Sequence, residues 1–369
     1  MPVDQQADVA RNCETIFVCL PRSSDVRNMV FAEDGLAAGL TRGSLIIDQT
    51  SGVPEETRQI ANELAKCGVA LIDAAVSASP HIVPLGGATL MVGAPDQILE
   101  RATPILRVIT ETIYRCGTRV GDGQAMKIVN NAMNATTRLG TLEVAVLGRK
   151  SGMSLADMAA FLNEGSARNQ TTDKMLPALV EGKSSTNFAL ALNTLGERAK
   201  LEDMVGVIEK LAGTRLASSE GEFPRKEAGA RHSPATQEQQ RTKELLEQAI
   251  ASLCLHITYE CAMVGVKYGL AMKDISDVVN KSSGWSASSR TLLPLLADGK
   301  DASIIDVQQS IQDLNQVCSL AIRLGAPLLI VNSVRNIWEQ ALNAASDQGS
   351  VDLAEFYQTA SKAKSPAFH

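Results

Sequence analysis

The chain has 369 residues, 45% of them hydrophobic and 21% charged, a composition typical of a soluble globular protein with room for two or three domains. A net charge of −6, only 4% aromatic residues and no dense Lys/Arg run argue against a nucleic-acid partner. The seven cysteines show no CxxC or Cys/His spacing and the four histidines are scattered, so neither a disulfide framework nor a metal site is predicted.

The first third of the chain alternates short apolar runs with amphipathic stretches. The runs predict strands at "TIFVCLP" (Thr15–Pro21), "SLIIDQT" (Ser44–Thr50), "ALIDAAV" (Ala70–Val76), "TLMVGA" (Thr89–Ala94) and "TIYRCG" (Thr112–Gly117). Between them, "PEETRQIANELAKCG" predicts a helix with Pro54 in its first turn and Gly68 at its stop. This alternation predicts a mostly parallel α/β sheet, which binds ligands at the carboxyl ends of its strands.

From Gly123 onward strand signals nearly vanish and long helices are predicted. One interruption, roughly Ser218–Gln237, is rich in charge, Gly, Pro and Ser and is interpreted as a loop or linker. The predicted segments are an α/β domain over residues 1–122, a helical domain over 123–217, a linker over 218–240 and a second helical domain over 241–369.

The two helical segments are related by a shift of 117 residues. The shift aligns Glu143 with Glu260, Gly148 with Gly265, Lys150 with Lys267, Gly152 with Gly269, Asp157 with Asp274, and Asn163 with Asn280. It also places "LPALVEG" over "LPLLADG". One ungapped shift that aligns this many residues predicts a duplicated helical unit.

The first helical segment opens with "GDGQAMKIVNNAMNATTRLG", an apolar helix with one polar stripe. The stripe consists of Lys127, Asn131, Asn134 and Arg138, at i, i+4, i+7 and i+11. A desolvated lysine has a lowered pKa and can exchange protons near neutrality, and Asn131 one turn later can orient a substrate hydroxyl. The alternative is that Lys127 extends to solvent and Asn131 covers a helix interface.

The repeat bears on this choice. The shift places Glu244 opposite Lys127 and Gln248 opposite Asn131, so the lysine stripe occurs only in the first copy, which favours chemistry there. Gly123, ahead of the helix, would let a ligand approach backbone N–H groups.

A second candidate cluster is "DAAVSASPHIVPLGGATLMVGA", at the end of a predicted strand. Ser77 and Ser79, with nearby backbone amides, could hold a carboxylate. The alternative is an ordinary polar turn closed by Pro80 and Gly86.

Together these blocks resemble the β-hydroxyacid dehydrogenases of the 3-hydroxyisobutyrate dehydrogenase group. The similarity is carried by "IFVCLPRSSDV", "LIIDQTSGVPEET", "LIDAAVSASP…GGATLMVGA" and "VGDGQAMKIVNNAM", in that order. The GxxxKxxxN block, Gly123, Lys127 and Asn131, is the most specific of them. The resemblance implies a Rossmann-type sheet followed by helical domains like those of 6-phosphogluconate dehydrogenase.

The resemblance also implies roles for individual residues. Lys127 would be the catalytic acid/base, and Asn131 would position the substrate. Ser77, with the backbone at Ala78 and Ser79, would bind its carboxylate.

On the cofactor side, the implied cofactor is NAD or NADP, with the substrate a small 3-hydroxy acid or its semialdehyde. Leu20 and Pro21 would contact the cofactor, and Ser51 would lie near the nicotinamide.

Three departures from the family pattern are visible. The sequence contains no GxGxxG turn, so the dinucleotide-binding sheet is expected to be truncated. The family's Ser-Gly-Gly is Ser77-Ala78-Ser79, and a late Lys-Asp pair is Gln312-Asp313. The expected function is an NAD(P)-dependent 3-hydroxyacid dehydrogenase. The alternatives are a catalytically inactive scaffold or partner-binding homologue, and an active enzyme whose true start lies upstream of Met1.

Location and assembly complete the expectations. Neither a signal-peptide pattern nor a long uncharged apolar run is present, so we expect a cytoplasmic protein without a membrane partner. A homodimer is expected, and the two helical copies should pack against each other with approximate two-fold symmetry or exchange between chains.

Overall fold

The computed structural model describes residues 5–78, 83–181, 237–300, 305–344 and 353–361, with Glu209, Gly213 and Leu216. Ser79 and most of the expected linker, residues 218–236, therefore lie outside the described residues. The chain divides into two compact units: residues 5–131 and 265–282 belong to the first, and the other described residues to the second. This boundary falls inside a helix, at Asn131, whereas the sequence suggested residue 122; the predicted four-segment division stays a prediction.

The first unit is built on a five-stranded sheet in the order β1-β2-β3-β4-β5. Its strands are β1 (Thr15–Val18), β2 (Leu45–Asp48), β3 (Ala70–Ser77), β4 (Thr89–Gly93) and β5 (Ile113–Gly117). Each lies within or nearly within its predicted run. The pairs β1–β2, β2–β3 and β4–β5 are parallel, so the prediction of a parallel-dominated sheet is confirmed.

The pair β3–β4 is antiparallel, which the sequence prediction did not include. Parallel neighbours need a crossover of a dozen or more residues, usually helical. Residues 78–88 contain no such helix among those described, only the short 3-10 turn η2 (Val83–Leu85). The chain therefore turns back and adds β4 in the opposite direction.

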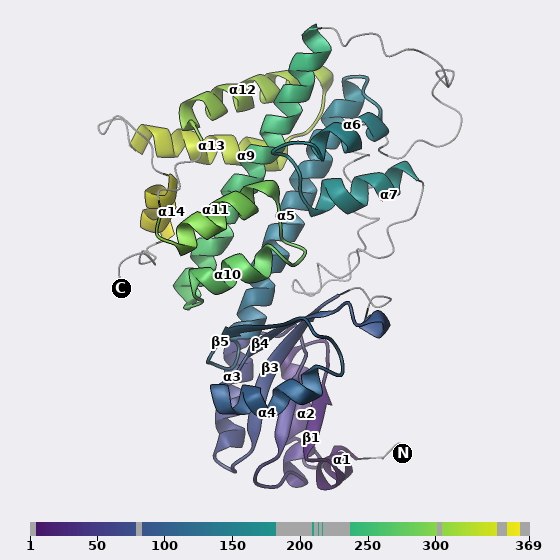
Figure 1. Cartoon of the computed structure of the whole chain (residues 1–369), viewed down its shortest axis with the longest axis vertical. Helices are drawn as coiled ribbons and strands as arrows, with labels where there is room; N and C mark the ends of the chain where they lie inside the picture. Colours follow the sequence, from purple (N-terminus) through teal and green to yellow (C-terminus); the bar gives the residue numbers. More distant parts are fainter. Residues whose placement is uncertain are drawn as a thin grey trace. The chain divides into compact units, whose positions relative to one another are not determined.

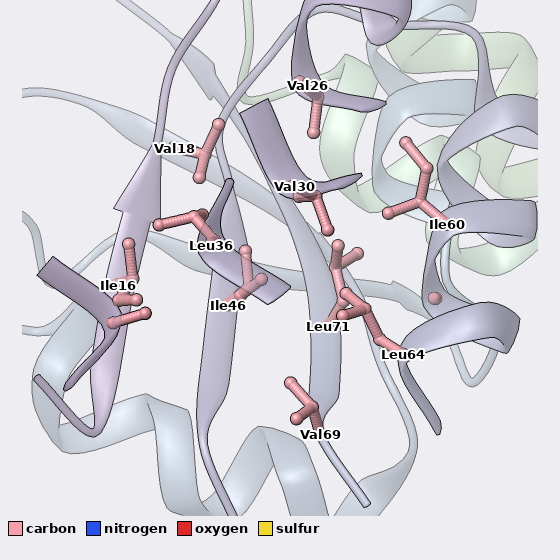
Figure 2. Close-up of a cluster of buried hydrophobic side chains, with 12 residues drawn as sticks. Ile16, Val18, Val26, Val30, Leu36, Ile46, Ile60, Leu64, Val69 and Leu71 are labelled. Atoms are coloured by element: carbon pink, nitrogen blue, oxygen red, sulfur yellow. The ribbon is translucent and has the colours of Figure 1, made fainter. Parts of the chain in front are cut away.

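Both faces of the sheet are covered, because apolar side chains alternate along its strands. In β2, Ile46 joins a cluster with residues from α2 (Ser23–Phe31) and α3 (Pro54–Ala65), the cluster drawn in Figure 2. Its neighbours Leu45 and Ile47 join a second cluster, with Ala102 and Leu106 of α4 (Asp96–Leu106). The sheet is thus the middle layer of the first unit, as Figure 1 shows.

Five of the described helices belong to the first unit, and the sequence predicted one of them, the helix that begins at Pro54. They are α1 (Gln6–Asn12), α2 (Ser23–Phe31), α3 (Pro54–Ala65), α4 (Asp96–Leu106) and α10 (Met272–Val279), with the 3-10 turn η1 (Leu36–Ala38). Pro54 is the first residue of α3, where its missing N–H costs nothing, and Gly68 takes a left-handed φ of 74° after the helix ends.

Helices dominate the rest of the described chain, as predicted. They are α5 (Asp122–Lys150), α6 (Leu155–Leu162), the π-helical turn η3 (Thr171–Met175), α7 (Leu176–Val180), α9 (Gln237–Tyr268), α11 (Ala287–Ala297), α12 (Val307–Leu324), α13 (Leu329–Ala344) and α14 (Leu353–Ser361). Helices α5 and α9 approach closely, since a Cβ at Gly140 would lie 2.1 Å from a methyl group of Leu253.

Helix α5 also holds the turn between α12 and α13. The Lys150 ammonium donates to the Leu324 carbonyl at 3.0 Å, and the Glu143 carboxylate accepts from the N–H groups of Leu329 and Ile330, each at 3.0 Å. A cation thus meets the carboxyl end of one helix and an anion the amino end of the next, as helix dipoles favour. Burial raises the pKa of Glu143 to about 7.

Helix α9 is the one described helix that is long and apolar enough to cross a membrane by composition, with a mean hydropathy of 1.5 in its best window. Within the structure, 72% of that window is buried. The apolar surface of α9 therefore packs against protein, as in the core helix of a globular unit.

Candidate functional site

Lys127 lies in the second turn of α5 and is buried, with 7% of its surface exposed. Its ammonium donates a hydrogen bond to the carbonyl oxygen of Val76, next to the last residue of β3. Burial lowers the pKa of Lys127 to about 8, because the charged form is poorly solvated there. The side chain does not extend to solvent, so the alternative in which Lys127 reaches solvent is wrong, while its catalytic role stays a prediction.

The other predicted substrate residues surround this lysine to different degrees. The hydrogen bond to Val76 brings Lys127 to the strand end that carries Ser77, and Ser77 and Ala78 are half-buried there. Asn131, one turn after Lys127, is half-buried. The structure thus brings Lys127 and the Ser77 end of β3 together, while substrate binding by Ser77, Ala78, Ser79, Gly123 and Asn131 stays a prediction.

Gly123 has a structural reason to be a glycine. A Cβ there would lie 2.2 Å from the carbonyl oxygen of Met91 and 2.8 Å from a carboxylate oxygen of Asp73. The space beside its α-carbon is therefore filled by β4 and β3. Close packing of the helix start on the sheet explains this glycine without a ligand.

The predicted cofactor residues lie at the carboxyl ends of the first two strands. Leu20 is half-buried, Pro21 and Ser51 are exposed, and Thr50, next to Ser51, is buried. The hydroxyl of Thr50 accepts a hydrogen bond from the backbone N–H of Leu20 at 3.0 Å. The two segments after β1 and β2 are thus tied together at the sheet edge where such folds bind ligands.

Two buried aspartates in the strands were not among the predicted residues. Asp48 and Asp73 are paired in the register of β2 and β3, and neither is exposed to solvent. Burial is the main cause that raises the pKa of Asp48 to about 6 and the pKa of Asp73 to about 7. The available signal was an aspartate inside an otherwise apolar strand, in "LIID" and "ALIDAAV".

Gln124 connects these carboxylates to the lysine helix. Its side-chain amide donates to the Thr50 carbonyl at 3.0 Å and to Asp48 Oδ2 at 3.4 Å. Two acceptors fix the direction of this amide, and its Oε1 is buried without a partner among the described residues. An unpaired buried oxygen of this kind is a place for a water molecule or a ligand donor.

The rest of the polar stripe has a different role. Asn134 and Arg138 are buried in the second unit, where the Arg138 guanidinium donates to Asn134 Oδ1 at 3.1 Å. Burial lowers the pKa of Arg138 to about 10. Asp313, the remnant of the late Lys-Asp pair, accepts from the guanidinium of Arg241 at 2.8 Å. Within the described residues, no group of three or more Asp, Glu, His or Cys side chains could hold a metal ion.

Two family models match the sequence. The NAD-binding domain of 6-phosphogluconate dehydrogenase matches residues 1–117. The NAD-binding model of NADP-dependent 3-hydroxyisobutyrate dehydrogenase matches residues 121–194 and 240–359, more than half of the chain. Both models describe NAD(P)-binding proteins, so the prediction of NAD or NADP as the cofactor is confirmed for the family.

Similar proteins of known activity include rat mitochondrial 3-hydroxyisobutyrate dehydrogenase. It is 32% identical over 183 residues, which are 49% of this chain and 54% of the rat protein. The 2-(hydroxymethyl)glutarate dehydrogenase of Eubacterium barkeri is 31% identical over 185 residues, 50% of this chain and 61% of that protein. The chain thus spans little more than half the length of the curated relatives it matches.

Solved structures agree with the fold. The 6-phosphogluconate dehydrogenase of Plasmodium falciparum superposes with a TM-score of 0.60 at 11% identity, covering 90% of this chain and 81% of that one. A variant imine reductase from Myxococcus stipitatus gives 0.51 at 14% identity, covering 98% and 84%. With the family match over half of its length, the chain belongs to the β-hydroxyacid dehydrogenase family, in the 3-hydroxyisobutyrate dehydrogenase group.

Proposed function

We propose that this chain is an NAD(P)-dependent oxidoreductase that transfers hydride between nicotinamide and a small 3-hydroxy acid or its semialdehyde, with Lys127 as acid/base. The observation that carries the proposal is the buried Lys127 amine at the end of β3, beside Ser77. A lysine with a pKa of about 8 holds both protonation states in useful amounts near neutrality.

The proton step follows from this protonation equilibrium. In the oxidation direction, neutral Lys127 takes the proton of the substrate hydroxyl, and in the reverse direction the ammonium returns it to the forming alkoxide. At pH 7 about 10% of Lys127 is neutral if its pKa is about 8, so oxidation should accelerate as the pH rises towards 8 and then level off. Asn131 would orient the hydroxyl, and Ser77 with the backbone of Ala78 and Ser79 would hold the carboxylate.

The cofactor would be held at the carboxyl ends of β1 and β2. Leu20 and Pro21 would contact it, with Ser51 near the nicotinamide, and when bound it supplies the hydride acceptor or donor. One observation supports a cofactor at this place. Among the described residues, the buried Oε1 of Gln124 has no hydrogen-bond partner, and the amide that carries it donates to the Thr50 carbonyl.

A binding and activity experiment tests this proposal. NADH and NADPH are titrated by fluorescence, and oxidation of a panel of small 3-hydroxy acids is followed with NAD and NADP. Lys127→Ala should lose roughly 10²–10⁴ in turnover with little change in cofactor affinity. Glu244→Ala, at the matching position of the second copy, is the control and should change neither.

The competing candidate is a catalytically inactive scaffold or partner-binding homologue. Dinucleotide binding distinguishes the two candidates, because a scaffold needs no site for the pyrophosphate. Absence of saturable binding of either dinucleotide at millimolar concentration would rule out a working dehydrogenase and favour the scaffold. An active Lys127→Ala variant would instead reject the role of the lysine.

We also propose that the helical unit is duplicated. Helix α10 (Met272–Val279) begins and ends 117 residues after α6 (Leu155–Leu162), and Gly152 and Gly269 ahead of them both take a left-handed φ, of 87° and 106°. The match of one family model to both residues 121–194 and 240–359 supports the same proposal.

The proposed copies pair about an approximate two-fold axis. The N–H of Gln170 donates to the carbonyl of Trp285 at 3.4 Å, and the N–H of Ala287 donates to the carbonyl of Arg168 at 2.7 Å. The 117-residue shift turns Arg168 into Trp285 and Gln170 into Ala287, so the two hydrogen bonds are counterparts. Reciprocal contacts between equivalent positions are typical of an isologous interface.

Assembly of whole chains is a separate proposal. A homodimer is expected from the sequence, and light scattering of the purified chain decides it. A single species of 39.2 kDa, the mass of one chain, would contradict the dimer.

A further inference from the structure

The start of helix α5 is closed by a carboxylate from the sheet. Oδ1 of Asp73 accepts the N–H of Gly121 at 2.6 Å, and Oδ2 accepts the N–H of Gln124 at 2.7 Å. The first N–H groups of a helix have no partner within the helix, and the positive end of its dipole favours an anion. Asp73, which is completely buried, fills that place in β3.

The start of α5 packs closely against the sheet. A Cβ at Gly93 would lie 2.5 Å from Asp73 Oδ1, and one at Gly117 would lie 2.1 Å from a carboxylate oxygen of Asp122. A Cβ at Gly121 would meet the Pro54 carbonyl at 2.7 Å. These contacts, with that of Gly123 on Met91, show that the first turn of α5 packs closely against the sheet and the start of α3.

The lysine is anchored to the same strand. Three residues along β3 from Asp73 cover about 10 Å, because a strand rises about 3.3 Å per residue. Three residues of helix from Gln124 to Lys127 cover only about 4.5 Å, and the Lys127 ammonium still reaches the Val76 carbonyl. Two anchors on one strand, Asp73 and Val76, thus set both the position and the rotation of the first turns of α5.

Gln124 extends the same connection to the other strand ends. Its backbone N–H is held by Asp73 of β3, while its side chain reaches the Thr50 carbonyl after β2. Thr50 in turn accepts from the N–H of Leu20 after β1. One residue therefore joins the lysine helix to both segments that carry the proposed cofactor contacts.

We propose that Asp73 and Gln124 are positioning residues of the proposed dehydrogenase site: Asp73 holds the Lys127 amine in its buried place, and Gln124 holds the Leu20 and Ser51 segments in register with it. The proposal rests on the proposed function. The role of Asp73, however, concerns the position of Lys127 alone and can be measured without a substrate. In this proposal the two residues act through Lys127 and through the Leu20 and Ser51 segments, without contact to the reacting atoms.

The alternative is a purely structural cap. A cap that only stabilises the fold would lower the stability of the unit when removed and leave the protonation of Lys127 as it was. A positioning carboxylate, when replaced, would let the amine reach water and shift its titration upward. The titration of Lys127 therefore separates the two roles.

The experiment is competitive labelling of amines with trace acetic anhydride from pH 6 to 11, read by mass spectrometry of the Lys127 peptide. Exposed Lys267 serves as the internal reference in the same digest. Wild-type Lys127 should titrate well below the ordinary lysine pKa of 10.5. Asp73→Asn, which offers an N–H₂ donor where an N–H needs an acceptor, should raise the Lys127 midpoint towards 10.5 by about one pH unit or more.

The controls decide the interpretation. Asp306→Asn removes the carboxylate that caps α12 through the N–H of Gln309, and should leave the Lys127 midpoint in place. A folded Asp73→Asn variant with an unchanged Lys127 midpoint would overturn the role of Asp73.

Gln124→Met keeps the volume of the side chain. It tests the role of Gln124 in holding the Leu20 and Ser51 segments, even if Asp73→Asn does not fold. It should weaken NADH or NADPH binding by about fivefold or more, the worth of about one hydrogen bond, with the Lys127 midpoint unchanged. Unchanged dinucleotide affinity would overturn the role of Gln124. A wild-type chain that binds neither dinucleotide would refute the proposed function, while the labelling result would still decide the role of Asp73.

Discussion

Burial of the charged Lys127 side chain should lower the free energy of unfolding, and the Lys127→Met variant measures by how much. Burial lowers the pKa of Lys127 from 10.5 to about 8, so the unfolded chain holds its proton more tightly than the folded one. At pH 7 both states are protonated and the folded state carries nearly the whole cost, about 3 kcal/mol at 1.36 kcal/mol per pKa unit. Methionine has similar volume and no charge, so the variant avoids this cost.

The pH dependence gives the sharper test. A lowered lysine pKa means that wild-type stability rises with pH between about 8 and 10.5, as the unfolded state also loses its proton. The stability advantage of Lys127→Met over wild type should therefore shrink by about 2 kcal/mol between pH 7 and pH 9.5. The hydrogen bond to the Val76 carbonyl is lost at both values, so it changes the size of the advantage by about 1 kcal/mol and leaves its slope unchanged.

The assay must report on the first unit alone, because both tryptophans, Trp285 and Trp338, belong to the second. Urea unfolding followed by pulse proteolysis, with detection of peptides from β2 to β4, meets this need. Lys267→Met, at an exposed lysine, is the control and should show no such pH-dependent advantage. An advantage of Lys127→Met that is the same at both pH values would refute a buried, depressed lysine.

Three further perturbations follow from the structure. Gly123→Ala places a Cβ 2.2 Å from the Met91 carbonyl and should destabilise the first unit by about 2–4 kcal/mol, whereas Gly86→Ala, with open space but a φ of 69°, should cost only about 1 kcal/mol in the same proteolysis assay. The pKa of Glu143 is raised to about 7, so the folded state of the wild type loses stability as the pH rises from 5 to 8 and the carboxyl ionises. The free energy of unfolding of Glu143→Gln, relative to wild type, should therefore rise by about 2 kcal/mol over this range in tryptophan-monitored unfolding. A difference that is the same at both pH values would contradict this. Burial lowers the pKa of His256 to about 4, so stability should be lost as the pH falls from 6.5 to 4, and His256→Gln should remove part of that loss in acid unfolding curves.

The sequence predicted the strands well because each is a short apolar run bounded by turn residues. It did not predict the direction of β4, since strand direction depends on how residues 78–88 connect β3 and β4, and composition does not encode that path. Lys127 could be found because a charged residue on an apolar helix breaks the pattern. Asp48 and Asp73 break the pattern of their strands in the same way, but their partners lie far away along the chain.

Gln124 and Gly123 illustrate the remaining difficulty. The contacts of Gln124 with Thr50 and of Gly123 with Met91 join positions that are distant in sequence, and only the packed helix start brings them together. A glycine before a helix suggested a ligand, because backbone exposed to a ligand and backbone pressed against a strand need the same small residue. The sequence alone could not distinguish these two reasons.

The close packing around the start of α5 has a consequence for protein engineering. Gly93, Gly117, Gly121 and Gly123 have no room for a methyl group, so libraries that vary them would consist mostly of unfolded or displaced variants. Ser77, Ala78 and Asn131 already carry side chains and are only half-buried. Laboratory evolution of a new substrate preference should therefore randomise Ser77, Ala78 and Asn131 and leave the four glycines unchanged. The first set can be selected for specificity, whereas the glycines keep the lysine helix in place.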